Sequence, residues 1–139
     1  MVGHGVLELP EPERHLALAL RYLEEGKTLI EKDPAQASEK LYKAAEEAVK
    51  MLTISFNMED ILKTVDERGR WTVTGLEKAV SRISKKLGDW FSAAWDRANY
   101  LHIWGFHEAK LDSEAVKERM PDIERMISET RKFIYGNND

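Results

Sequence analysis

The chain has 139 residues, a length typical of one domain with a substantial hydrophobic core. Hydrophobic residues make up 42% of it and charged residues 33%, which is a globular and not a disordered composition. The net charge of −4 argues against a broadly basic nucleic-acid-binding surface, and the lack of cysteine excludes disulfides, thiolate metal sites and a cysteine nucleophile.

The sequence predicts a cytoplasmic protein with no membrane partner. No apolar run approaches the roughly 18–20 residues that span a bilayer, and the segment from Met1 to Pro12 lacks the basic and apolar layout of a signal peptide. Gln36 is the single glutamine among abundant charged residues, a balance that resembles thermophile proteins. We expect one domain over residues 1–139, with an ordered core from about 12 to 135.

Hydrophobic residues recur with a helical period from the start of the chain. The first predicted helix runs from about Pro12 to Lys32 and places Leu16, Leu20, Leu23 and Ile30 on one stripe. Asp33-Pro34 is a helix start, because proline at the first helical position follows a capping aspartate. The second predicted helix, about Pro34 to Asn57, gathers on one face Leu41, Ala45, Ala48, Leu52 and Phe56.

The middle of the chain predicts shorter helices. A short helix over Glu59–Glu67 ends before Gly69. Thr74-Gly75-Leu76-Glu77 has the pattern of a capping box and predicts the start of another helix, which Gly88 ends. Asp89 is then the expected cap of a helix reaching about Ile103, which Gly105 loosens or ends.

The last predicted helix begins at Asp112-Ser113 and contains Pro121, which should kink or restart it. Its stripe is Val116, Met120, Ile123, Ile127 and Ile134. No alternating strand pattern and no repeat is evident. The fold class is therefore all-α, an up-and-down bundle of four to five helices.

One segment carries the residue types that chemistry needs. Arg97, Asn99, His102, His107 and Glu108 fall within twelve residues; Trp95 lies just before them and Trp104 lies between the two histidines. Arginine is a permanent cation whose donors suit phosphate, and histidine exchanges a proton near neutral pH. A cation beside a proton acceptor is a minimal set for binding or cleaving a phosphodiester.

Helical geometry limits how these residues can meet. Arg97 and His102 are five apart, so on a straight α-helix their side chains diverge by about 140°. Asn99 and His102 are three apart and share a face. Two structural alternatives remain: Arg97 pairs with Asp96 or with an acidic residue of another helix, and His102 is a hydrogen-bonded core histidine.

A metal site is not predicted, because His102 and His107 lack the i, i+4 spacing that places two ligands on one face of an α-helix. The motif helix and the residues directly after it also carry six aromatic residues that suit base stacking, a bundle core or a dimer interface: Trp90, Phe91, Trp95, Tyr100, Trp104 and Phe106. The adjacent Glu46-Glu47 pair predicts a solvated face with Lys43 and Lys50.

The Arg97-x4-His102 pattern in a small helical protein resembles the HEPN superfamily. The string Leu101-His102-Ile103-Trp104-Gly105-Phe106-His107-Glu108 and the second-helix segment Ala37–Lys50 are similar to its archaeal PaREP group. The resemblance covers about Pro12 to Tyr135.

This resemblance implies a helical homodimer and a metal-independent ribonuclease without cofactors. Arg97 would bind phosphate, His102 would act as acid or base, and Asn99 would take the polar position within the motif. We add His107, Glu108 and Trp104 as candidate binding residues. Trp104 stands where some toxin members carry a tyrosine used by a nucleotidyltransferase antitoxin.

Two further interpretations remain open. The first is a non-catalytic module that binds a nucleotide or a partner, such as a nucleotidyltransferase. The second is a structural dimer in which the polar motif serves only the interface. A dimer is expected in general, because one bundle of this size has difficulty covering Trp90, Trp95, Trp104 and Phe106 while leaving the motif exposed.

Overall fold

The computed structural model describes residues 11–136, which fold as helices without a β-strand in that range. The segment from Met1 to Pro12, for which no signal peptide was predicted, lies mostly outside the described residues. The six α-helices are α1 (Glu11–Leu29), α2 (Pro34–Ser55), α3 (Glu59–Arg68), α4 (Val73–Leu87), α5 (Asp89–Tyr100) and α6 (Ser113–Tyr135), and a π-helix, η2 (Leu101–His107), follows α5 directly. The all-α prediction is confirmed, whereas the predicted number of four to five helices is too low.

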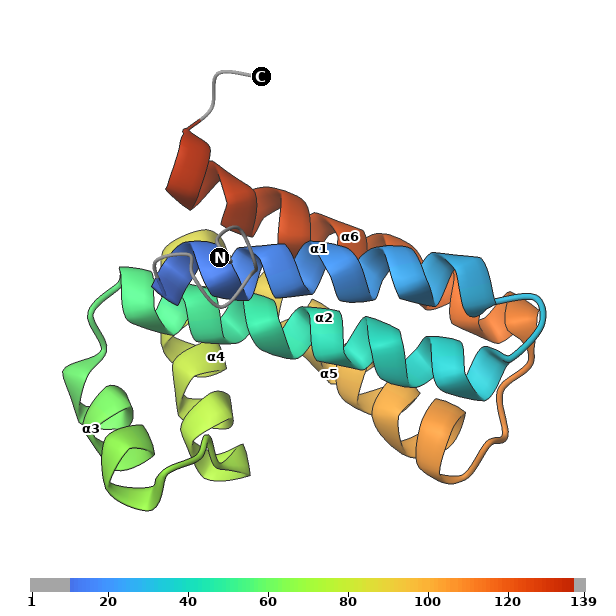
Figure 1. Ribbon diagram of the computed structural model, residues 1–139, viewed down its shortest axis with the longest axis horizontal. Helices are drawn as coiled ribbons and strands as arrows, with labels where there is room; N and C mark the ends of the chain where they lie inside the picture. The colour runs from blue at the N-terminus through green and yellow to red at the C-terminus, as the bar shows by residue number, and fades with distance from the viewer. Residues whose placement is uncertain (1–10, 137–139) are drawn as a thin grey trace, which may run out of the picture.

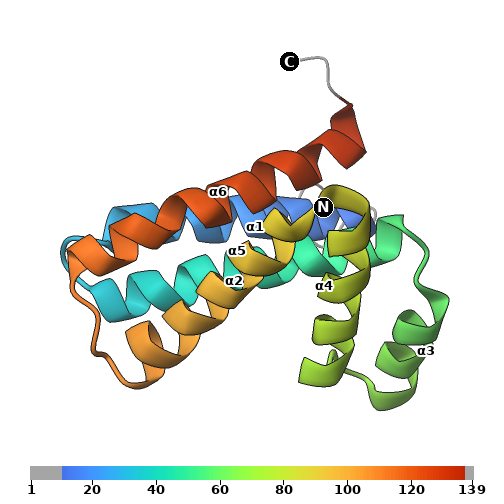
Figure 2. The same ribbon diagram turned by 180° about the vertical axis from the view of Figure 1, so that it is seen from behind.

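Helix α2 is the central element, since it contacts every other helix of the described chain. It runs antiparallel to α1, and α3 and α4 project as a hairpin from one end of this pair (Figure 1). Seen from behind, α5 crosses α2 while α6 lies along α1 (Figure 2). The antiparallel α1–α2 pair agrees with the up-and-down arrangement expected from the sequence for these two helices.

The predicted stripes form the core. Close approach to α2 is possible because its inward residues are small: Ala37, Ala44, Ala45 and Ala48 have no exposed surface. Large side chains from the other helices fill the space around them, and the largest fully buried ones include Trp95, Phe91, Leu16, Ile83 and Ile123. Most residues of the predicted stripes are buried, whereas four of them are only partly buried against the core: Leu20, Phe56, Met120 and Ile134.

The predicted helix starts are right in two places and wrong in two others. Asp33 and Asp112 cap α2 and α6 by accepting hydrogen bonds from the backbone N–H groups of Gln36 and Ala115. The predicted capping box at Thr74 is wrong, since Thr72 caps α4 by accepting from Gly75 N at 3.0 Å.

Glu77, the other member of that predicted box, accepts a hydrogen bond from the Trp95 indole at 2.6 Å instead. Asp89 is likewise the first residue of α5 and not its cap, which is Gly88 with a left-handed φ of 118°. Both differences arise because tertiary contacts and backbone geometry decide among neighbouring candidate caps.

The helices differ from expectation at the two residues predicted to interrupt them, Pro121 and Gly105. Helix α6 continues through Pro121 without a restart. Gly105 does not end the motif helix; the helix changes from α to π at Leu101 and continues to His107. The chain then leaves it at Ala109, which adopts a left-handed φ of 51°.

Candidate functional site

The π-helix η2 positions the histidines of the motif. A π-helix has i to i+5 hydrogen bonds, is rare and frequently lies at functional sites. Here Glu108 N donates to Ile103 O at 2.9 Å, which is such an i+5 bond. Gly105 lets η2 lie close against α2, because a Cβ at this position would meet Ser38 Oγ at 2.2 Å.

His102 is held by two residues of α2. Its Nδ1 lies 2.7 Å from Glu39 Oε1, and its ring stacks on Tyr42 with the ring centroids 4.2 Å apart. The side chain of His102 keeps 27% of its surface exposed, against 16% for Glu39. His102 is therefore hydrogen-bonded, as one structural alternative expected, but it lies at the surface and not in the core.

His107 completes a pair with His102. The two Nε2 atoms are 3.2 Å apart, and the ring planes are inclined by 78°. Because the residues are separated by five positions on a π-helix, they share one face, as residues four apart do on an α-helix. The pairing of these two exposed Nε2 atoms was not predicted.

Arg97 faces a different part of the molecule. It donates to Asp122 on α6 at 2.7 Å, and 54% of its side chain is exposed. The amide of Asn99 donates to Trp95 O at 3.0 Å within α5. Within one chain, Arg97, Asn99 and His102 therefore have three different partners, and Arg97 makes the interhelical ion pair that one structural alternative expected.

The remaining candidate binding residues are exposed. Glu108 follows η2 directly, and Trp104 keeps 45% of its surface accessible. Trp95, by contrast, is 1% exposed and belongs to the core. Trp90 and Phe106 are partly buried, so the bundle covers more of the aromatic residues than their number suggested.

A stripe on α2 that was not predicted borders the histidines and carries two carboxylates. Glu39, Tyr42 and Glu46 are spaced by three and four residues, a signal for one helical face. Burial, helped by the carboxylates of Glu46 and Glu39, raises the pKa of Tyr42 far above its ordinary value. Burial also raises the pKa of Glu46, although Lys50 acts in the opposite direction.

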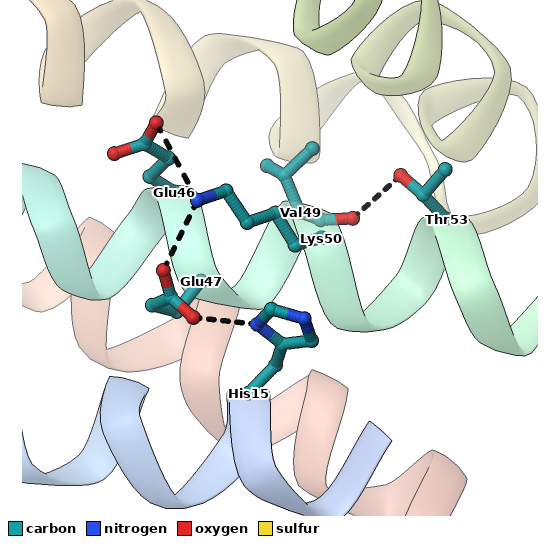
Figure 3. Close-up of polar contacts among 6 residues, drawn as sticks. All are labelled: His15, Glu46, Glu47, Val49, Lys50 and Thr53. Carbon is teal, nitrogen blue, oxygen red and sulfur yellow. Dashed lines mark hydrogen bonds and ion pairs between the residues drawn. The ribbon is translucent and has the colours of Figure 1, made fainter. Parts of the chain in front are cut away.

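Glu47, the second residue of the Glu46-Glu47 pair that was predicted to be solvated, is buried. Glu47 is 8% exposed and accepts from His15 of α1 at 2.6 Å, while Lys50 lies 3.3 Å from its second oxygen (Figure 3). Burial alone would raise the pKa of Glu47, but the His15 hydrogen bond and the Lys50 charge lower it below its ordinary value of 4.5. The prediction of a solvated face is therefore wrong for Glu47.

A cavity of about 410 Å³ lies elsewhere, between α3 and α4, and none of the motif residues lines it. Across residues 11–136, no helix has the length and apolar character to span a membrane. In the same range, no three side chains among His, Cys, Asp and Glu are grouped so as to hold a metal ion.

Comparisons place these features in a known group of proteins. The model of the archaeal PaREP1/PaREP8 family matches residues 14–127. A crystal structure of a Sulfolobus solfataricus protein is 35% identical, with a TM-score of 0.79 over 84% of this chain and 96% of the other. A solution structure of the Orf c02003 protein is 34% identical, with a TM-score of 0.73 over 86% and 93%. No curated protein matches the chain.

Proposed function

The chain belongs to the archaeal PaREP1/PaREP8 family, and we propose that it is a HEPN-like, metal-independent endoribonuclease that acts as a homodimer. The observation that carries this proposal is the surface imidazole of His102. Its Nδ1 lies 2.7 Å from Glu39, so the ring is oriented and Nε2 points away from that carboxylate. An oriented imidazole is the usual form of a general base, and His102 Nε2 takes this role when RNA displaces His107 Nε2, which lies 3.2 Å away.

The reaction is cleavage of RNA through its own 2′-hydroxyl. His102 Nε2 accepts the 2′-hydroxyl proton while the 2′ oxygen bonds to phosphorus, and the bond from phosphorus to the 5′ oxygen breaks. The imidazolium then returns the proton to the departing 5′ oxygen, which leaves a 2′,3′-cyclic phosphate. Glu39 stabilises the imidazolium and fixes its tautomer, the part a carboxylate plays beside a catalytic histidine.

Arg97 is the proposed phosphate ligand. More than half of its side chain is exposed, and its partner Asp122 also lies at the surface, so a phosphate can take the place of that carboxylate. Because Arg97 and His102 face different helices within one chain, the proposed site combines residues of two subunits. Asn99 has a positioning role, since its amide holds the last turn of α5.

The test is cleavage of a fluorescently labelled single-stranded RNA by the full chain in EDTA. His102→Asn is the informative variant, because the asparagine amide can still donate to Glu39 from the position of Nδ1 while the base is lost. Loss of Nε2 should lower the cleavage rate by about 100-fold or more. Full activity of His102→Asn would refute the assignment.

Arg97 has a matched control in its ion-pair partner. Arg97→Ala should weaken RNA binding, whereas Asp122→Ala, which frees the guanidinium, should leave it unchanged or tighten it. If both variants lose melting temperature equally and neither changes RNA binding, the Arg97–Asp122 contact is only a structural ion pair. Binding of RNA by the wild type without cleavage in EDTA would favour the non-catalytic module, with a nucleotidyltransferase as a candidate partner.

A further inference from the structure

We propose that His102 and His107 form a binding site for a divalent transition metal ion, with zinc as its reference ion, in which both imidazole Nε2 atoms are ligands. The inference is independent of RNA cleavage, because it depends on how η2 arranges two imidazole rings. Nitrogen ligands of this kind suit zinc, copper and nickel.

The π-helix supplies the spacing. Two histidines four apart on an α-helix share a face and bind zinc together, as in the H-E-x-x-H motif. A π-helix has more residues in each turn and pairs residue i with residue i+5. His102 and His107 are five apart within η2 and therefore share a face. The spacing that excluded a metal site on an α-helix favours one here.

The distance between the two nitrogens fits one ion. Zinc lies about 2.0–2.1 Å from imidazole nitrogen, so two ligands at a tetrahedral angle are roughly 3.3 Å apart. The Nε2 atoms of His102 and His107 are separated by 3.2 Å. Both atoms can therefore contact the same ion without a large movement of either ring.

Glu39 and Tyr42 prepare one ligand for this role. Metal-binding histidines usually donate their other ring N–H to a carboxylate, which fixes the tautomer and makes the ligand more basic. Glu39 lies 2.7 Å from His102 Nδ1, and Tyr42 stacks on the ring. With Nδ1–H donated to Glu39, the lone pair of His102 is on Nε2, the atom that faces His107.

The site is open on its outer side. His107 is exposed, and within residues 11–136 no third His, Cys, Asp or Glu is grouped with the pair to complete a closed cage. Water would fill the other two positions of a four-coordinate ion. If His102 is also the base in RNA cleavage, bound zinc would occupy its Nε2 and inhibit that reaction.

A direct hydrogen bond between the two rings is the competing explanation for the short distance between the Nε2 atoms. Calorimetric titration with zinc chloride distinguishes this explanation from a metal site. The full chain without an affinity tag should bind one zinc ion in a chelator-free buffer. His107→Ala should lose binding, and Glu39→Gln should weaken it by about 10–100-fold. Glu118→Gln, which removes an exposed carboxylate on α6, should leave binding unchanged.

Ring resonances of His102 and His107 in NMR spectra should shift together as zinc is added. The proposal is overturned if the wild type shows no saturable binding, or if His107→Ala binds as the wild type does. Because the titration contains no RNA, its result does not depend on whether the protein is a ribonuclease.

Discussion

At the residue scale, the buried carboxylate of Glu47 shows how strongly one side chain can depend on its partners. It lies between α1 and α2 with hydrogen bonds from His15 and Lys50. A buried charge that loses its partners is costly, whereas a paired one is tolerated. This network therefore ties α1 to α2 through a buried carboxylate inside an otherwise apolar contact.

The lowered pKa of Glu47 predicts a particular pH dependence of stability. Because the folded-state pKa lies below the ordinary value of 4.5, folding favours the carboxylate. Its contribution is present above pH 4.5 and is lost as the pH falls through the lower folded-state value. Glu47→Gln should cost about 1–3 kcal/mol of unfolding free energy at pH 7, since it weakens hydrogen bonds to a charged group.

Urea denaturation of both proteins between pH 7 and pH 3 measures this effect. The difference in unfolding free energy between wild type and Glu47→Gln should shrink in acid. Glu118→Gln, which changes an exposed carboxyl on α6, is the control and should behave as the wild type at every pH. A Glu47→Gln difference that stays constant over the range would contradict the assigned pKa direction.

The sequence identified the chemical types at the candidate site but only part of its geometry. Arg97 and His102 were correctly expected to diverge, since they contact Asp122 and Glu39 on different helices. Glu39 lies 63 residues from His102 in the chain, and no local pattern connects them. A partner of this kind is fixed by tertiary packing and cannot be found from spacing along one helix.

At the scale of elements, the start of α4 offers a direct comparison between two neighbouring threonines. Thr72 accepts the capping hydrogen bond, while Thr74 is exposed on the first turn. Thr72→Ala should therefore lower the unfolding free energy by about 1 kcal/mol. Thr74→Ala should change it by less than about 0.5 kcal/mol, as most surface substitutions do. Urea denaturation gives both values, and the reverse order would restore the capping box predicted at Thr74.

The contact between η2 and α2 yields a second prediction at this scale. A Cβ on residue 105 would lie 2.2 Å from Ser38 Oγ and 2.5 Å from Ser38 Cβ, so Gly105→Ala forces η2 away from α2. Overpacking of this kind costs about 1–3 kcal/mol. Thermal denaturation measures the loss, and NMR of the histidine rings shows whether the His102–His107 pair is disturbed.

Two variants check the cause. Ser38→Gly combined with Gly105→Ala should recover most of the lost stability, because both atoms that clash are then absent. Gly26→Ala should cost less than Gly105→Ala, since its new Cβ meets the flexible end of Leu41 at 2.9 Å. If the double variant is no more stable than Gly105→Ala alone, the close approach to Ser38 is not what selects glycine.

Helix positions were predictable from the sequence because hydrophobic period and capping residues act locally. Asp33 and Asp112 mark the starts of α2 and α6 for this reason. The π-helix was not predictable from the sequence, since it depends on the packing of η2 against Ser38 and on the left-handed backbone of Ala109. That single change of helix type alters which residues of the motif share a face.

At the scale of the whole molecule, α2 organises the fold, and one face of the motif helix remains uncovered. The bundle buries Trp95 and Phe91 almost completely. Three apolar or aromatic residues near the end of this helix stay exposed, at 40%, 47% and 45% of their surface: Tyr100, Ile103 and Trp104. Neighbouring exposed residues of this size are a common mark of a protein interface.

We therefore expect two copies of the chain to pair through this surface, which brings the two motif segments together. A stable pair would bury about 800 Å² on each subunit. Sedimentation equilibrium at tens of micromolar should show a dimer for the wild type and a monomer for Trp104→Glu, because a buried carboxylate without a partner opposes association. The helical circular dichroism signal should be the same for both, since Trp104 contributes little to the core.

Val73→Glu and Phe133→Glu serve as controls, as both replace exposed apolar residues on other helices, α4 and α6. Both variants should remain dimeric. A wild type that sediments as a monomer would rule out a catalytic site shared by two subunits. A dimer that Phe133→Glu disrupts and Trp104→Glu does not would move the interface to α6, where Arg97 and His102 of different subunits would have no reason to meet.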